Sequence, residues 1–243
     1  MQNPVVSGDS LKLFVKACVE EGIAQGSFEF GKKGGFYNWE GPNIFTDNQN
    51  NNFGEEFLYN YVLFYNLNND NQILFPSFNQ FHKNYEILIN NSIKNCFSNF
   101  DYYNDLGYDV NLEQLTVNAE INETFSLIDV NSEVVYEIGN EVGTIKEFPK
   151  VKVPLYLGKM YEFTNYFLNY IESNEEIPYS NSYLDGLCDN YDFNWFDYSF
   201  YNDVEDSIVH YIIIKQNYKS FYEQVHNNDE EFLFMFAIKA IYN

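Results

Sequence analysis

Four oxygen-bearing side chains near the middle of the chain are the first candidates for chemistry. They are Asp105, Asp109, Asn111 and Glu113, set around Gly107. Loops that wrap calcium take oxygen ligands from about every second residue, which this series resembles. The EF-hand register is not met, because the twelfth position counted from either Asp101 or Asp105 holds no glutamate. The pattern favours a solvated acidic strand edge and leaves a calcium-dependent ligand-binding module as an alternative.

A second candidate is an acidic segment rich in aromatic residues in the last quarter of the chain. Tyrosine and tryptophan are common at protein interfaces, because they combine a large contact area with a polar tip. We expect part of this segment to be buried and a subset of its side chains to face a protein partner. The residues proposed to contact that partner are Asp189, Tyr191, Asp192, Trp195, Asp197, Tyr198 and Asp203.

The remaining reactive side chains give no local catalytic signature. Lys32 and Lys33 lie among three glycines and could hold an anion, but a turn between strands explains them better. The three histidines, His82, His210 and His226, do not pair with each other or with cysteine at metal-ligand spacing. Phosphate-binding glycine loops and a serine nucleophile elbow are also missing from the sequence. We therefore predict a protein that is not an enzyme and needs no cofactor.

Helical periodicity dominates the first hundred residues. Apolar residues from Leu11 to Val19 recur at helical spacing and predict a first helix that ends at Gly22. The glycine-rich stretch that follows predicts a short strand and turn around residues 28–30. Residues 55–67 are apolar, aromatic and long enough for a buried helix, and residues 80–97 predict another.

The middle of the chain changes to a period of two, and its end returns to helical spacing. Residues 112–117, 125–130 and 134–138 predict a small antiparallel meander with a turn at Asn131 and Ser132. Residues 151–157 alternate but contain proline, which places them at a sheet edge. Three further helices are predicted over residues 159–172, 203–224 and 229–242. The last two form a C-terminal helical hairpin.

These elements predict the α+β class: N-terminal helices, a central small antiparallel β-meander and a C-terminal helical hairpin. Strands and helices do not alternate as a doubly wound sheet requires. At 243 residues the chain is interpreted as a single α+β domain over 1–243, with a possible sub-boundary near 100–111.

The charge of the chain argues against direct binding of nucleic acid. The chain has no arginine, and its 13 lysines face 36 Asp and Glu, for a formal net charge of -23. An AT-rich coding bias accounts for missing arginine and abundant Asn, Tyr and Phe, but the same bias would raise lysine. The acidity therefore needs its own cause. Because phosphate contacts are made chiefly by Lys and Arg, we predict no direct nucleic-acid binding.

Cysteine usage and hydropathy bear on location. Cys18, Cys96 and Cys188 are odd in number and far apart, so we expect neither a disulfide framework nor a zinc site, and hence a reducing compartment. The N-terminus lacks a secretory signal, and no apolar run is long enough for a membrane span. The prediction is a protein of the virion or host cytoplasm, not secreted by a signal peptide and without membrane contact.

The hypothesis for function is a non-enzymatic protein that acts through protein–protein contacts as a homo- or hetero-oligomer. The first interpretation is a structural or assembly component of a virus or phage particle. The alternative is an acidic inhibitor, either a toxin immunity protein or an anti-defence protein that mimics nucleic-acid charge. Such a protein would be steered to a basic groove on its target. A mimic needs carboxylates in rows on one face, whereas here the acids are spread along the chain.

Overall fold

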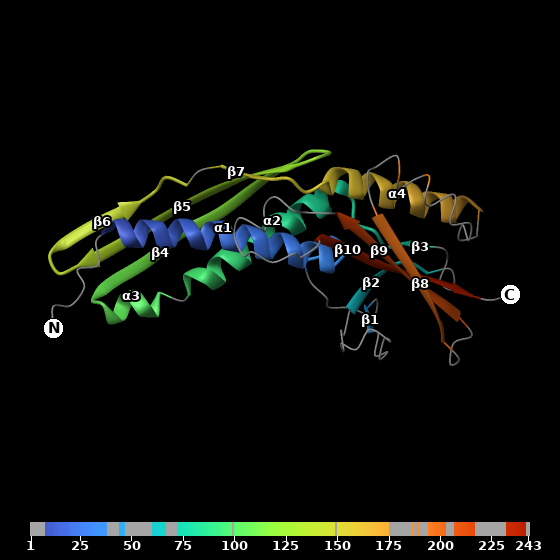
Figure 1. The fold of residues 1–243 in the computed structure, drawn as a ribbon, viewed down its shortest axis with the longest axis horizontal. Helices are drawn as coiled ribbons and strands as arrows, with labels where there is room; N and C mark the ends of the chain where they lie inside the picture. The colour runs from blue at the N-terminus through green and yellow to red at the C-terminus, as the bar shows by residue number, and fades with distance from the viewer. Residues whose placement is uncertain are drawn as a thin grey trace.

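The fold was analysed in a computed structural model, which describes residues 8–37, 44–46, 60–66, 72–98, 100–148, 150–174, 186, 189, 194–202, 207–216 and 232–241. The described residues form helices and two separate sheets, so the α+β class is confirmed. The first sheet lies toward one end of the long axis, and the second sheet lies toward the other (Figure 1). Helix α1 runs from the first end toward the second sheet. No described helix has the length and apolarity required to cross a membrane.

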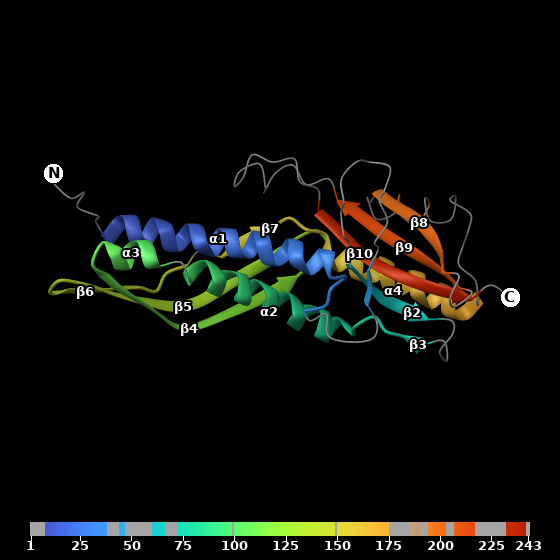
Figure 2. The ribbon, with the colours of Figure 1, turned by 90° about the horizontal axis from the view of Figure 1, so that it is seen from below.

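Two helices, α1 (Gly8–Lys32) and α2 (Phe78–Phe97), lie side by side at the centre of the molecule (Figures 1 and 2). The predicted helix at 80–97 is confirmed, and Ser77 caps it by accepting a hydrogen bond from the Gln80 amide. The predicted end of the first helix at Gly22 is wrong. The helix continues for ten more residues through the segment expected to form a strand at 28–30.

Glycines inside α1 permit close contact with α2. A Cβ atom built on Gly26 would lie 2.6 Å from the Ile89 Cα, and one built on Gly22 would lie 2.7 Å from the Ile93 Cα. Any larger residue would force the two backbones apart. These glycines therefore serve helix packing rather than chain reversal, and the tertiary contact outweighs their poor helix propensity.

A disulfide bond joins the same two helices. Cys18 of α1 and Cys96 of α2 are bonded, with their Cα atoms 5.5 Å apart, across 78 residues of sequence. Cys18 stands one helical turn before Gly22, so the bond extends the line of close contacts along the helix pair. The expectation that these cysteines stay unpaired is wrong, because the fold brings together two residues that sequence spacing does not connect.

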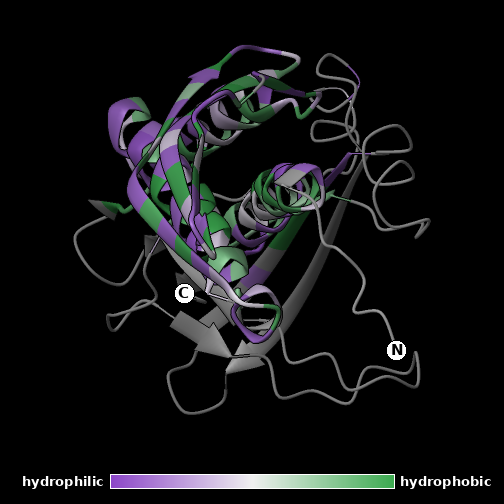
Figure 3. Cartoon of the chain, turned by 90° about the vertical axis from the view of Figure 1, so that its left-hand side faces the viewer, coloured by the Kyte–Doolittle hydropathy of each residue, from purple (hydrophilic) through white to green (hydrophobic). Residues whose placement is uncertain are grey.

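The first sheet covers one side of the helix pair. A short helix α3 (Asp101–Asp105) leads into strands β4 (Tyr108–Ile121), β5 (Ser126–Ile138), β6 (Glu141–Ile145) and β7 (Val151–Val153). β4, β5 and β6 follow one another as antiparallel neighbours, and β7 pairs with the first residues of β5 beside β6. Along the strands hydrophilic and hydrophobic residues alternate (Figure 3). The predicted antiparallel sheet in the middle of the chain is confirmed.

One detail of that sheet differs from the prediction. Asn131 and Ser132, expected to form a turn, lie inside the continuous strand β5. The irregularity falls on the partner strand instead, where the register shifts between Glu113 and Thr116 and Gln114 has a φ of 45°. A bulge of this kind lets a long strand keep its apolar residues inward while it bends.

The second sheet consists of strands far apart in sequence: β1 (Ile44–Thr46), β2 (Asn60–Asn66), β3 (Gln72–Ile73), β8 (Asn194–Asn202), β9 (Ser207–Gln216) and β10 (Phe232–Ile241). Their order is β1-β2-β10-β9-β8, with β3 also paired to β2. β10 runs parallel to β2 and antiparallel to β9. Gly31 at the end of α1 lies against Phe232 and Leu233 of β10 and connects the helix pair to this sheet.

Three predicted helices are wrong in this region. The described parts of segments 55–67, 203–224 and 229–242 are the strands β2, β9 and β10, so the C-terminal helical hairpin does not exist. Consecutive residues from Phe234 to Ile238 are all buried. A strand buried on both faces reads as a continuous apolar run, which periodicity does not distinguish from a buried helix.

Helix α4 (Leu157–Asn174) packs with the second sheet, as the contact between the Phe167 and Phe236 rings shows. It confirms the helix predicted at 159–172.

At the predicted sub-boundary near 100–111, the Phe100 and Tyr103 rings both contact Phe14 of α1. The buried apolar residues of both sheets and the helices form one continuous cluster. That 1–243 behaves as a single domain stays a prediction.

Gly26→Ala is expected to lower the free energy of unfolding. Alanine gains helix propensity of up to about 1 kcal/mol, but its Cβ must displace the backbone of α2. We expect a net loss of about 1–3 kcal/mol, measured by urea unfolding. Gln25→Ala on the exposed side of the same turn is the control and should change stability by less than about 0.5 kcal/mol. A Gly26→Ala protein more stable than wild type would contradict the close packing.

Reduction of the Cys18–Cys96 bond is expected to destabilise the fold by about 4 kcal/mol, because the bond closes a long loop in the unfolded chain. Under denaturing conditions without reductant, thiol titration should find one reactive thiol per chain, and three after reduction. A Cys188→Ser variant serves as the control and should keep the same thermal shift on reduction. Three reactive thiols before reduction would show that the bond is absent.

Candidate interaction site

The structure does not bring the predicted calcium ligands together. Asp105 ends α3, whereas Asp109, Asn111 and Glu113 are exposed at alternate positions along β4. In an extended strand such positions are about 6.6 Å apart, so their oxygens spread out in a row. Among the described residues, no three His, Cys, Asp or Glu side chains gather closely enough to hold a metal ion. The geometry gives the calcium hypothesis no support.

The acidic aromatic segment is only partly described. Tyr191, Asp192 and Asp203 lie outside the described residues, and Asp189 is exposed. Trp195, Asp197 and Tyr198 lie on β8, the terminal strand of the second sheet, where they pair with Ile214, Ile212 and Tyr211 of β9. The described residues 194–202 of the segment therefore lie on a strand at the end of the sheet. Its role in partner binding stays a prediction.

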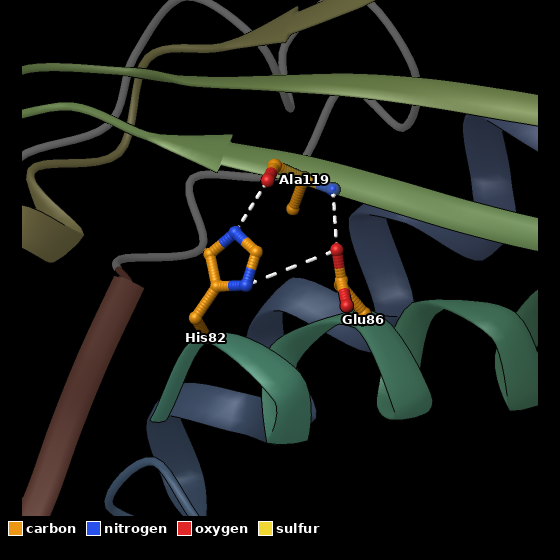
Figure 4. Close-up of polar contacts among 3 residues, drawn as sticks. All are labelled: His82, Glu86 and Ala119. Atoms are coloured by element: carbon orange, nitrogen blue, oxygen red, sulfur yellow. Dashed lines mark hydrogen bonds and ion pairs between the residues drawn. The ribbon is translucent and has the colours of Figure 1, made fainter. Parts of the chain in front are cut away.

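His82 has a structural role on the edge of the first sheet (Figure 4). A ring nitrogen of His82 is hydrogen-bonded to the Ala119 carbonyl of β4, while Glu86, one turn along α2, accepts a hydrogen bond of 2.9 Å from the Ala119 amide. The other ring nitrogen lies 3.8 Å from the Glu86 carboxylate. Together the two side chains satisfy both backbone groups of one edge residue.

Asn90 continues this contact. With its amide oriented to satisfy both neighbours, it donates to the Leu115 carbonyl at 3.2 Å and accepts from Lys94 at 3.3 Å. Residues 82, 86 and 90 are spaced by four and thus form one stripe of α2. The stripe covers the free backbone edge of β4, which would otherwise be open to pairing with another strand.

A buried polar cluster lies deeper, between both helices and the sheet. The Tyr85 hydroxyl is 2.9 Å from the Ser27 hydroxyl, which itself donates to the Ile23 carbonyl. Burial raises the pKa of Tyr85 to about 12, and the nearby Ser27 and Ser126 hydroxyls oppose this shift. Since Tyr85 is fully buried and neutral at ordinary pH, we interpret the cluster as part of the core and not as a reactive centre.

A groove of about 720 Å³ lies between the first half of α1 and the β6–β7 connection. Val15, Val19 and Ile145 form its buried apolar floor. Leu13 on its rim is 69% exposed, the largest such fraction among the exposed large apolar residues of the described chain. A single exposed leucine is common on protein surfaces, but together with the apolar floor it provides a continuous apolar area that another protein can contact.

Charge is balanced in this groove, unlike in the rest of the chain. Its lining includes three lysines, Lys12, Lys16 and Lys146, and three acids, Asp9, Glu20 and Glu147. Over the whole chain acids outnumber lysines 36 to 13. Lys12 and Lys16 form ion pairs of 3.6 and 3.7 Å with Asp9 and Glu20. Exposed pairs of this kind contribute little, so a partner could replace them.

Comparison of the chain with protein-family models, curated protein sequences and solved structures finds no match. The function of the groove must therefore follow from its own shape and charge.

The outer face of β4 and β5 carries the opposite charge character. Asp109 lies opposite Glu137 and Glu113 lies opposite Glu133 in the strand register. Glu120 and Asp129 lie on the same face, and Asn118 pairs with Asp129. Like charges directly opposite each other destabilise a sheet. We call the residues Asp109, Glu113, Glu120, Asp129, Glu133 and Glu137 the acidic face.

Sequence reasoning missed both surfaces. The groove joins segments about 130 residues apart, which no local motif connects. One signal was available: Leu13 breaks the polar side of the first helix, where a lysine or glutamate is usual. The acidic face was partly visible as the Asp109–Glu113 series, but its second row on β5 depends on strand register.

The contact between α2 and β4 predicts that Glu86→Ala lowers stability by about 1–2 kcal/mol, because it removes the acceptor of the Ala119 amide. Hydrogen exchange of that amide should become faster by at least tenfold, and Glu86→Gln should keep part of the protection. Glu162→Ala on the exposed side of α4 is the control for loss of a helical glutamate. Unchanged exchange at Ala119 in Glu86→Ala would refute the contact.

Proposed function

We propose that this protein has no enzymatic activity and acts by binding other proteins, as a structural or assembly subunit of a virus or phage particle. The observation that carries the proposal is the groove between α1 and the β6–β7 connection. It combines an apolar floor, an exposed leucine and balanced charge in a chain of net charge -23. Local neutralisation of negative charge lowers the repulsion that an acidic partner meets at this place on a strongly acidic protein.

The Cys18–Cys96 bond supports a particle over the host cytoplasm. Disulfides persist at virion surfaces and in other oxidising environments, and they are rare in a reducing cytosol. The bond also fixes α1, which forms one wall of the groove, to α2, which covers the edge of the first sheet. A subunit that must survive outside a cell benefits from such a constraint, because it does not depend on a partner for its own stability.

A second candidate function is the acidic inhibitor, and the acidic face favours it. Two rows of carboxylates on neighbouring strands provide the one-sided arrangement that a nucleic-acid mimic needs. However, Lys146 and Lys150 form ion pairs with Glu133 and Asp129, at 2.8 and 3.0 Å, and neutralise part of the inner row. The partner of such an inhibitor would carry a basic groove, and the complex would weaken steeply with salt.

The proposal predicts that lysines of the groove are shielded in the native assembly. Acylation of surface lysines, read by mass spectrometry, should modify Lys12, Lys16 and Lys146 at least fivefold more slowly in the natively purified assembly than in the isolated chain. Lys32 and Lys83, which are exposed away from the groove, are the controls and should react equally in both.

Leu13→Glu should also reduce incorporation into the assembly, while Tyr166→Glu on α4 should not, since both side chains are well exposed and neither is needed for the core. Native protein that is a strict monomer, with groove lysines as reactive as the controls, would overturn the assembly role. A salt-sensitive complex with a basic nuclease in that case would support the inhibitor.

A further inference from the structure

We propose that the partner in the groove is a second copy of this chain, which presents its acidic face to the groove and to the lysines beside it. This inference rests on the proposed assembly function and names the neighbour that the groove receives. The contact joins two different surfaces of the same protein, so it is head-to-tail.

The first surface is the groove together with the lysines beside it. Lys12 and Lys16 lie on the α1 wall of the groove, and Lys146, Lys150 and Lys152 follow along the β6–β7 edge. These are five of the 13 lysines in the protein. The side chains of Lys12, Lys16, Lys146 and Lys150 are between 55% and 62% exposed. We call these five residues and the groove the basic edge.

The second surface is the acidic face, on the outer side of β4 and β5. Its outermost row, Asp109, Glu113 and Glu120, lies on β4. No lysine lies on that strand. Val135 and Leu127 of β5 lie opposite Asn111 and Glu120, so apolar side chains are interspersed with the carboxylates. Such a surface offers carboxylates to the lysines of the basic edge and apolar side chains to the apolar floor of the groove.

The strand order separates the basic edge from the outer row of the acidic face. β4 is one end of the strand order, and β6 and β7 occupy the other side of β5. The two surfaces meet on β5, where Lys146 and Lys150 form ion pairs with Glu133 and Asp129, and the carboxylates of the outer row on β4 lie beyond that contact. A stripe of α2 covers the backbone edge of β4, so a neighbouring copy would make contact there through side chains and not by adding a strand.

Net repulsion between two chains of charge -23 does not prevent this contact at physiological salt. The Debye length is then about 8 Å, so charges far from the contact are screened while pairs within it still attract. A head-to-tail contact that repeats produces a ring if its rotation closes, and a filament if it does not. Either product agrees with a particle subunit.

Charge reversal tests the contact on the full chain at 0.15 M salt, with molar mass measured by light scattering over a range of concentrations. Lys12→Glu/Lys16→Glu/Lys146→Glu should weaken self-association at least tenfold, and so should Asp109→Lys/Glu113→Lys/Glu120→Lys. Mixing the two variants should restore association, because each reversed surface then meets its opposite. Lys32→Glu/Lys83→Glu, reversed at exposed lysines outside both surfaces, is the control and should associate like wild type.

Each outcome decides between this inference and the proposed function. Circular dichroism and thermal melting first establish that each variant is folded; if one triple variant does not fold, Lys16→Glu and Glu113→Lys replace the triples. Restored association on mixing supports the inference. Triple variants that each self-associate as strongly as wild type overturn it. A wild-type chain that stays monomeric overturns it too, and shielding of the groove lysines in the native assembly would then show that a different protein occupies the groove and that the proposed function stands.

Discussion

The close approach of α1 and α2 is the constraint on which the other elements depend. At Gly22 and Gly26 the space between the helices admits no side chain, and the Cys18–Cys96 bond fixes the same contact covalently. Both helices contact both sheets. α2 covers the edge of β4 through His82 and Glu86, and its Phe81 ring contacts Phe234 of β10. α1 lines the groove beside β6 and reaches β10 through Gly31. The two sheets share no strand, so the helix pair connects them, together with the hydrogen bonds of Gln216 in β9 to the backbone of Pro154 and Tyr156. A change in the helix–helix distance would therefore shift the groove, whose one wall is α1.

How far the sequence predicts this fold depends on how many faces of each element are buried. Helices α2 and α4 have one buried face, and their periodicity was sufficient to predict them. The C-terminal half of α1 is buried nearly all round, so its glycines looked like chain breakers when they are packing residues. β10 was mistaken for a helix for a related reason: buried on both faces, it shows no alternation. In β9 burial alternates, but apolar residues occupy both faces of the strand, so its sequence does not show that alternation. The partners that bury these elements come from distant segments, and a single sequence does not reveal them.

The candidate surfaces also depend on segments that are far apart in the sequence. Asp109 and Glu113 were noticed because they are close in sequence, and the strand that carries them spreads them along a row. The significance of that row appears only when register places Glu137 and Glu133 opposite. Cross-strand pairs of like charge cost stability. Lys146 offsets part of this cost at Glu133, whereas no ion pair is found at Asp109 or Glu137 among the described residues. A sheet selected for stability alone would distribute these charges differently. This is the physical reason to regard the acidic face as a contact surface.

The position of the lysines carries more information than their number. A coding bias can remove arginine from a whole chain, but it acts on every codon alike and does not decide where the remaining positive charges lie in the fold. Here five of 13 lysines gather along one side of a single sheet, on segments about 130 residues apart in sequence. Four of them pair with carboxylates whose side chains are between 34% and 86% exposed, so water partly screens these pairs, and Lys152 lies over the Phe125 ring. These intramolecular ion pairs contribute little free energy. A second set of carboxylates that excludes water around the lysines contributes more, because the attraction is stronger where water is absent. The acidic face of a neighbouring copy provides such a set, and this makes the lateral separation of charge, rather than the total of -23, the property that a function must explain.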